Sequence, residues 1–230
     1  MTVVDLNSDL GEGLPSEIDD SLLSLVSSAN VACGGHAGDE ATMRRTVRVA
    51  LQNGVRIGAH PSYPDRERFG RDHIDMTVKE LVATLTEQLA GLLDIASAGG
   101  GRVAYLKPHG ALYNDAAAGD RVAGEALMKV AGKFRLPMMM LPKSVFARWA
   151  GSVIREGFLD RAMRKDGSLV PRSEPGALIT DADAVARQAV ELAPTVDSLS
   201  LHSDTPGAVG LMRAAREALL HAGYEIGAAK

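Results

Sequence analysis

The sequence predicts one α/β domain in which seven parallel strands close into a barrel surrounded by helices. Short β-branched runs alternate with long amphipathic stretches along all 230 residues, and no Pro-, Gly- or Ser-rich linker separates them. Seven such strand and helix units average about 33 residues each, which is close to the size of a βαβ crossover. Each predicted strand also has one polar and one apolar face. We therefore expect residues 1–230 to form a single domain.

The strands are predicted where short apolar and β-branched runs stop at turn residues. In chain order they are 3–9, 30–34, 56–60, 102–107, 137–141, 158–163 and 198–201. The helices are predicted where apolar residues recur at helical spacing. In chain order they are 20–28, 39–53, 77–98, 117–133, 144–155, 181–193 and 207–222.

Local signals fix the ends of two of these helices. The second helix stops before Gly54, a residue suited to the left-handed C′ position. The third begins at Thr77 with Glu80 three residues later, which is a capping box, and it ends before three consecutive glycines.

The faces of the strands decide between two architectures, because alternate residues of a strand lie on the same face. One parity is polar and includes Asp5, Asn7, Asp9, His60, Lys107, His109, His202 and Asp204. The other is apolar and includes Leu6, Ile57, Leu106 and Leu201. An open doubly wound sheet carries helices on both faces and should be apolar on both. A TIM-like barrel turns its apolar parity toward the helices and its polar parity into one shared concavity, so we favour the barrel.

The composition limits the classes of function. The 25 basic and 29 acidic residues give a net charge of −4, which leaves no electrostatic footprint for nucleic acid. Cys33 is the only cysteine and cannot form an internal disulfide, as is typical of the reducing cytoplasm. The N-terminus has no signal-peptide pattern, and no apolar run approaches the roughly 20 residues of a membrane span. We expect a cytoplasmic protein with no membrane partner.

Polar residues gather at the C-terminal ends of the predicted strands, where parallel α/β proteins place their sites. Four of the six histidines lie there, and acidic and amide residues accompany them: His36, His60, His109 and His202, with Asp9, Glu12, Asp39, Asp65, Asn114 and Asp204. One such histidine by itself most simply satisfies a hydrogen bond under a loop. Four at equivalent places favour a functional site, whereas His73 and His221 are expected to be structural.

Two of these strand ends are followed by turns that contain candidate catalytic or ligand-binding side chains. Residues 7–13 join two carboxylates to two glycines, so the backbone can approach a ligand while one carboxylate acts as a base. Residues 36–39 place His36 and Asp39 around a flexible turn before a helix. Asp39 is equally suited to bind a ligand and to be the N-cap of that helix, so both roles are kept.

Six segments together carry a resemblance to a known family. They are HAGD at 36–39, GAHPSYPD at 58–65, KPHGALYN at 107–114, EGFLDR at 156–161, DGSLVPR at 166–172 and HSDTP at 202–206. The chain resembles the LamB/YcsF family over nearly its whole length, from Asp5 to about Gly223. Asp72, Leu159, Met163 and Ser203 depart from the usual family pattern. The resemblance implies a barrel related to glycoside hydrolases and polysaccharide deacetylases, in agreement with the strand parity.

The resemblance also implies a reaction: 5-oxoprolinase activity, in which the lactam of 5-oxoproline opens to L-glutamate as ATP is hydrolysed to ADP and phosphate. The chain would be the A subunit of this enzyme, working with subunits B and C. Asp9 or Glu12 would be the general base on water, and His60 or His109 would carry the proton to the ring nitrogen. Lys107 would stabilise the developing oxyanion or phosphate.

The residues of the chain also suggest, as a hypothesis, how substrate and nucleotide are held. Arg71, Arg161 or Arg172 would bind the substrate carboxylate in a bidentate pair. Further substrate-binding candidates are Asn7, His36, Asp39, Asn114, Asp160, His202 and Asp204. The chain has no Walker A pattern, since Lys143 and Ser144 lack the preceding glycines. We therefore expect ATP, with magnesium, to bind mainly through the partner subunits.

Two alternatives remain open. Several His and Asp residues facing one lumen would also suit a stand-alone amidohydrolase or deacetylase that activates water on a divalent metal. No HExxH or similar short signature supports that interpretation, and the sequence does not decide whether a metal is bound. A third possibility is a non-catalytic subunit that captures a small acidic ligand and presents it to a partner.

Overall fold

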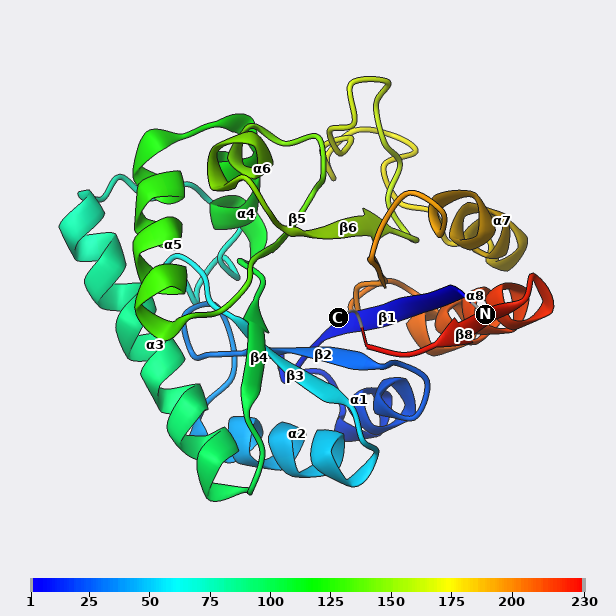
Figure 1. Cartoon of the computed structure of the whole chain (residues 1–230), viewed down its shortest axis with the longest axis horizontal. Coiled ribbons are helices and arrows are strands. Elements are labelled where there is room, and N and C mark those ends of the chain that lie inside the picture. Colours follow the sequence, from blue (N-terminus) through cyan, green and yellow to red (C-terminus); the bar gives the residue numbers. More distant parts are fainter. Residues whose placement is uncertain (1, 229–230) are drawn as a thin grey trace.

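The computed structural model describes residues 2–228 and confirms a nearly closed barrel of seven parallel strands (Figure 1). The strand order is β4-β3-β2-β1-β7-β6-β5. The strands are β1 Thr2–Leu10, β2 Ser28–Ala32, β3 Arg56–His60, β4 Val103–Leu106, β5 Met139–Met140, β6 Ile154–Phe158 and β7 Ser198–Ser200. Between β4 and β5 the ring is joined by an isolated bridge from Leu106 to Met138 and by a hydrogen bond from the Leu106 amide to the Pro137 carbonyl.

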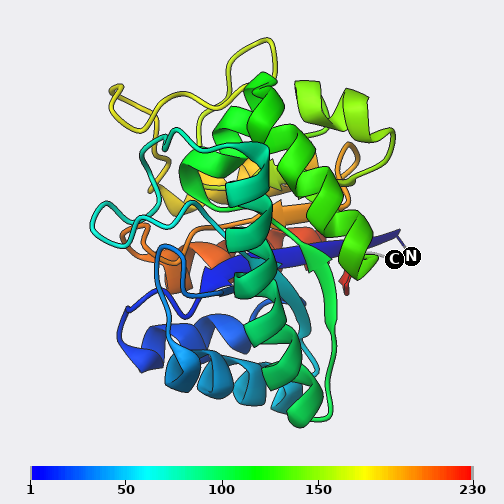
Figure 2. The ribbon, with the colours of Figure 1, turned by 90° about the vertical axis from the view of Figure 1, so that its left-hand side faces the viewer.

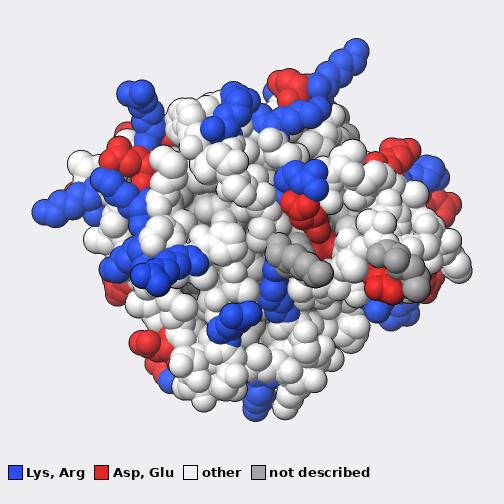
Figure 3. Space-filling view, viewed as in Figure 1, with Lys and Arg blue, Asp and Glu red and all other residues white. Residues whose placement is uncertain are grey.

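Helices cover the outside of the ring. They are α1 Ser16–Leu23, α2 Glu40–Gln52, α3 Val78–Ala98, α4 Gly110–Ala118, α5 Arg121–Phe134, α6 Val145–Ala150, α7 Ala182–Leu192 and α8 Ala208–His221. The loops at 61–77 and 159–181 gather at one end of the barrel, while the chain termini lie at the other end (Figure 2). On the end that carries the termini, Lys and Arg side chains are spread out and mixed with Asp and Glu (Figure 3).

The core lies between the ring and the helices, as the strand parity predicts. Leu6, Ile57, Leu106 and Leu201 are at most 1% exposed and belong to this layer. The opposite parity fills the lumen with polar groups such as Asp5 and Asn7, which are both 0% exposed. These buried polar groups are hydrogen-bonded, as burial requires. Asp5, for example, accepts from Ser27 and Ser28.

Helix α3 is long and apolar enough to cross a membrane by length and composition alone. The expectation that no apolar run approaches that length was therefore wrong. The structure accounts for the apolar residues differently, because Leu81, Leu85, Leu89 and Leu92 are 0% exposed and pack in the core. This is the amphipathic pattern of a helix that covers a barrel.

The clearest disagreement with the sequence concerns β6, which was predicted at 158–163 and is found at Ile154–Phe158. The predicted helix at 144–155 ends at Ala150, where Gly151 adopts a φ of 74°. An inward-facing charge at Glu156 hid the strand, since burial of a carboxylate gives no apolar signal. Residues at 159–163 belong instead to a loop with isolated bridges.

Other boundaries also differ from the prediction. The helix expected at 117–133 is two helices, because Gly119 with a φ of 100° ends α4 and Asp120 caps α5. The first helix begins earlier than the predicted residue 20, at Ser16. A further strand, β8 (Tyr224–Ile226), was not predicted, and it pairs in parallel with the first residues of β1.

Gly58 shows how tightly the lumen is filled. A Cβ at this position would lie 2.2 Å from Cζ of Tyr105, whose ring is 0% exposed. Overpacking of this kind typically costs 1–3 kcal/mol, so we expect Gly58→Ala to lower the free energy of unfolding in urea by about that amount. Gly132→Ala is the control, because it adds a Cβ to an open position in α5 and is expected to raise stability by up to about 1 kcal/mol. Equal stability of Gly58→Ala and wild type would contradict the packing described here.

Candidate active site at the mouth of the barrel

A cavity of about 700 Å³ opens where the strands end. On its inner side lie acidic and basic groups from the ends of β1, β3 and β4: Asp9, Glu12, His60, Lys107 and His109. On its outer side lie Arg71, Asn114, Arg161, Arg172, His202 and Asp204. The predicted shared concavity is therefore confirmed, with Asp5 and Asn7 deeper in the same lumen, where Asn7 donates to Ser198 over 2.7 Å.

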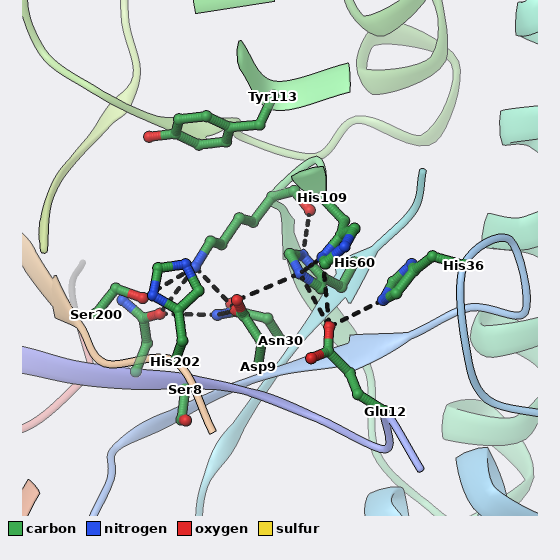
Figure 4. Close-up of polar contacts among 12 residues, drawn as sticks. Ser8, Asp9, Glu12, Asn30, His36, His60, His109, Tyr113, Ser200 and His202 are labelled. Carbon is green, nitrogen blue, oxygen red and sulfur yellow. Dashed lines mark hydrogen bonds and ion pairs between the residues drawn. The ribbon is translucent and has the colours of Figure 1, made fainter. Parts of the chain in front are cut away.

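Lys107 belongs to a buried charge network with Asp9 and Glu156. Figure 4 shows Asp9 beside Asn30, and Glu12 among the three histidines of the same site. Nζ of Lys107 lies 2.9 Å from Oδ1 of Asp9, 2.8 Å from Oε1 of Glu156 and 3.0 Å from Oγ of Ser200. Burial alone would lower the pKa of Lys107, but the two carboxylates outweigh it and raise that pKa above its usual 10.5. Two negative charges thus face one positive charge, and the network holds Asp9 in place.

Asp9 is ionised in this network. Burial would raise its pKa, but the charges of His60 and Lys107 outweigh burial and hold the pKa well below the usual 3.8. Asn30 and Lys107 both bind Oδ1, at 2.7 and 2.9 Å. Oδ2 lies 3.5 Å from Nε2 of His60. Oδ1 of Asp9 is thereby held by two donors from the barrel, whereas Oδ2 of the same ionised carboxylate makes the longer contact with His60.

Glu12 faces three histidines. Its Oε1 lies 2.9 Å from Nε2 of His36, 3.3 Å from Nδ1 of His109 and 3.7 Å from Nε2 of His60. Burial would raise the pKa of Glu12, but hydrogen bonds with His109 and His36 lower it overall. Burial lowers the pKa of His36 to about 4, so this imidazole is neutral at neutral pH.

The two other histidine pKa values move in opposite directions. For His60, burial would lower the pKa, but the Asp9 charge raises it overall. For His109, burial lowers the pKa despite Glu12. His60 therefore takes the extra proton before His109 does.

The outer side of the cavity carries positive charge. Arg71 and Arg172 both pair with Asp204, the second at 3.2 Å. Arg161 is 6% exposed, and its Nε has no hydrogen-bond partner among residues 2–228. Burial and the nearby Arg172 charge lower the pKa of Arg161 to about 10, so it remains cationic at neutral pH. An anionic group of a ligand would complete this buried guanidinium.

Four predicted substrate-binding residues lie elsewhere than the cavity wall, and their binding role stays a prediction. Asn7 lies below it in the lumen, and His36 lies behind Glu12. Asp39 is the N-cap of α2 and accepts from the Thr42 amide over 2.8 Å, which is the alternative left open by the sequence. Asp160 is 0% exposed and binds Nδ1 of His202 at 3.0 Å, so it orients that ring.

Glu156 and Tyr113 both belong to the site, although no role was predicted for either from the sequence. The Tyr113 hydroxyl donates to Oε2 of Glu156 over 2.9 Å, and Oε1 of the same carboxylate faces Lys107. A correct register for β6 would have found Glu156 as an inward-facing charge. His73 pairs with Asp115 away from the cavity, in line with the structural role expected of it.

Asp19 of α1 supports the loop that carries Glu12, because the Gly11 amide donates to its Oδ2 over 3.0 Å. Burial raises the pKa of Asp19 from 3.8 to about 6. The folded chain therefore binds this proton more tightly than the unfolded chain, and ionisation destabilises the fold increasingly as the pH rises from about 4 to about 6.

We expect Asp19→Asn to remove the destabilisation of the fold that ionised Asp19 causes. In urea unfolding the variant should be more stable than wild type by about 1–3 kcal/mol above about pH 7, with no gain below about pH 4. Asp20→Asn, which changes the exposed neighbouring carboxylate, is the control and should show no such pH-dependent gain. A stability difference that does not vary with pH would contradict the raised pKa.

The whole chain is similar to proteins of one known family. The sequence profile of the LamB/YcsF family matches residues 4–230. A protein of Streptomyces avermitilis that is named as the A subunit of 5-oxoprolinase is 46% identical, over 98% of this chain and 99% of that protein. The crystal structure of a lactam utilization protein from Thermus thermophilus superposes with a TM-score of 0.90 at 37% identity, over 99% of this chain and 100% of that one.

A more distant structure shares the fold alone. A family 4 carbohydrate esterase from Streptomyces lividans superposes with a TM-score of 0.55 at 15% identity, over 98% of this chain and 92% of the esterase. The barrel fold expected from the sequence is therefore confirmed, and this esterase shares it.

Proposed function

The chain belongs to the LamB/YcsF family, and on that premise we propose that it is the A subunit of an ATP-dependent 5-oxoprolinase. In this reaction the lactam of 5-oxoproline opens to L-glutamate, with hydrolysis of ATP to ADP and phosphate. One observation supports the proposal: two opposed groups line the same cavity. On one side is the fixed, ionised carboxylate of Asp9. On the other is the buried guanidinium of Arg161, whose Nε has no partner among residues 2–228. This arrangement suits a small anionic substrate that is attacked by water.

Asp9 is the general base in this proposal. Its Oδ1 is held by Lys107 and Asn30, so Oδ2 accepts the proton of the attacking water. Lys107 is already neutralised by Asp9 and Glu156, and we therefore assign it the positioning of Asp9 in place of the oxyanion role expected from the sequence. Arg161 binds the substrate carboxylate or the phosphoryl group.

His202, as the imidazolium held at Nδ1 by the Asp160 carboxylate, donates the proton on Nε2 to the leaving ring nitrogen. Its Nδ1 is fixed by Asp160 at 3.0 Å and its ring stacks on Phe158, so Nε2 remains for the ligand. His60 and His109 suit this step less well than the sequence implied, since both nitrogens of each ring already have contacts within the site. The proposed proton donor is thus a histidine that was predicted from the sequence only as a substrate-binding residue.

ATP and magnesium bind mainly through subunits B and C in this proposal, because the chain lacks a Walker A loop. We place the assembly in the cytoplasm. An unactivated lactam presents the full barrier of amide hydrolysis, and each 1.4 kcal/mol of missing activation costs about tenfold in rate. Partner subunits that activate the lactam with ATP would remove that barrier.

The test is reconstitution. We expect the purified chain alone to release little or no glutamate from 5-oxoproline, and the chain with subunits B and C, ATP and magnesium to release glutamate and phosphate together. Omission of the chain from the mixture is the control and should abolish glutamate release. Hydrolysis of 5-oxoproline by the chain alone, without ATP, would refute the proposed coupling and favour a stand-alone hydrolase.

A further inference from the structure

We propose that Glu12, His36, His60 and His109 form a binding site for one divalent transition-metal cation, with zinc the best match to the donors. Their ligand atoms all lie within 4.8 Å of one another. The residues come from the ends of four neighbouring strands, β1 to β4, so the ring itself brings them together. The cluster binds the cation whatever substrate the cavity takes.

The separations between the donors match those around a small tetrahedral cation. Zinc binds nitrogen and carboxylate oxygen at roughly 2.0–2.1 Å, which places neighbouring ligand atoms roughly 3.3 Å apart. From Oε1 of Glu12 the distances to the three imidazoles are 2.9, 3.3 and 3.7 Å. Nε2 of His60 lies 3.0 Å from Nδ1 of His109. These values scatter around the expected separation.

The hydrogen bonds of two rings direct their lone pairs to the same point. Nδ1 of His60 lies 2.8 Å from the Lys107 carbonyl, and Nε2 of His109 lies 2.9 Å from the Phe69 carbonyl. A carbonyl only accepts, so each of these nitrogens carries a proton. Nε2 of His60 and Nδ1 of His109 are therefore the ring atoms left to bind a cation, and they face each other across 3.0 Å. Histidines that bind metals are oriented by this kind of outer hydrogen bond.

The loop after β3 closes tightly over the cluster. A Cβ on Gly70 would lie 2.8 Å from Cβ of His36 and 3.1 Å from Cδ2 of His109. Phe69 adopts a φ of 58°, which is unusual for a residue with a side chain, and thereby aims its carbonyl at His109. Strain of this kind is held in place at functional sites. The imidazoles are thus fixed before any ligand arrives.

The donor set selects the metal. Three imidazoles and one carboxylate suit zinc and neighbouring transition metals, whereas magnesium and calcium prefer oxygen ligands. The cluster is therefore distinct in chemistry from the magnesium that accompanies ATP.

The test measures metal binding directly. The chain is stripped with a chelator, returned to chelator-free buffer and titrated with zinc chloride by calorimetry, and separately with cobalt(II) chloride by visible absorption. We expect one zinc per chain, ligand-field bands of a four- or five-coordinate cobalt site, and no binding of magnesium chloride. Glu12→Gln and His109→Gln should each weaken zinc binding by at least about tenfold, the loss caused even by changes to outer partners of metal ligands.

His202→Asn is the matched control, because it removes a histidine from the same mouth of the barrel and outside the cluster. It should retain wild-type affinity for zinc, and circular dichroism verifies that every variant is folded. No zinc binding by the wild type, unchanged binding in both cluster variants, or an equal loss in His202→Asn would overturn the proposal. Reconstituted 5-oxoprolinase activity is assayed separately, so a chain that binds zinc without supporting turnover refutes the proposed function alone.

Discussion

Asp9→Asn is expected to lower the turnover of the reconstituted 5-oxoprolinase by about 10²-fold or more. Asparagine keeps the shape of the side chain and an oxygen for Lys107 and Asn30, but it does not accept a proton from water. The loss should therefore appear in kcat, measured as glutamate release at saturating 5-oxoproline and ATP. Thermal unfolding of the same preparation shows whether the variant remains folded.

His221→Ala is the control for this experiment, because this histidine lies in the last turn of α8, away from the cavity. It should leave turnover unchanged. Wild-type turnover in Asp9→Asn would remove Asp9 from the role of base and transfer it to Glu12, the other carboxylate at the cavity. Glu12→Gln, assayed in parallel, decides between the two.

Lys107→Met should lower the free energy of unfolding by about 3–5 kcal/mol, which is the usual effect of removing one partner from a buried ion pair. The variant leaves Asp9 and Glu156, which are 2% and 0% exposed, without their common counter-ion. Urea unfolding at neutral pH measures the change. Lys129→Met removes a surface pair with Glu125 and should cost at most about 1 kcal/mol.

A second variant separates charge from packing. Lys107→Met combined with Glu156→Gln removes one of the two uncompensated carboxylates, so it should recover part of the stability lost in the single variant. If Lys107→Met alone is as stable as wild type, the network does not hold the lumen together. Equal losses in the single and double variants would assign the effect to packing of the lysine stem.

The barrel was predictable because its lumen is polar. Strand parity placed Lys107 and His60 on the inside and Leu6 and Ile57 on the outside, and the structure confirms both. The same property made β6 hard to find, since its inward residue Glu156 breaks the apolar run that marks a strand. Periodicity detects burial of apolar groups and does not detect burial of a charge that is paired across the barrel.

The candidate site was predictable to the level of strand ends and no further. Residues that close a strand were found, but their individual roles depend on contacts over long sequence separations. Asp160 illustrates this, since it is 42 residues from His202 and serves to orient it. Asp39 illustrates the reverse, because its contact is local and it caps a helix. Sequence spacing alone did not distinguish these two aspartates.

The position of β1 in the strand order has a consequence for how the chain folds. β1 is made first, yet it lies between β2 and β7, so one of its edges remains unpaired until residues 198–200 are available. Lys107 likewise contacts groups at positions 9, 156 and 200. Pairing over such separations is slow, because loop closure precedes the contacts that stabilise it. On the ribosome, the buried charge network therefore assembles only after nearly nine-tenths of the chain has been synthesised, and ring closure and assembly of the site become one late event.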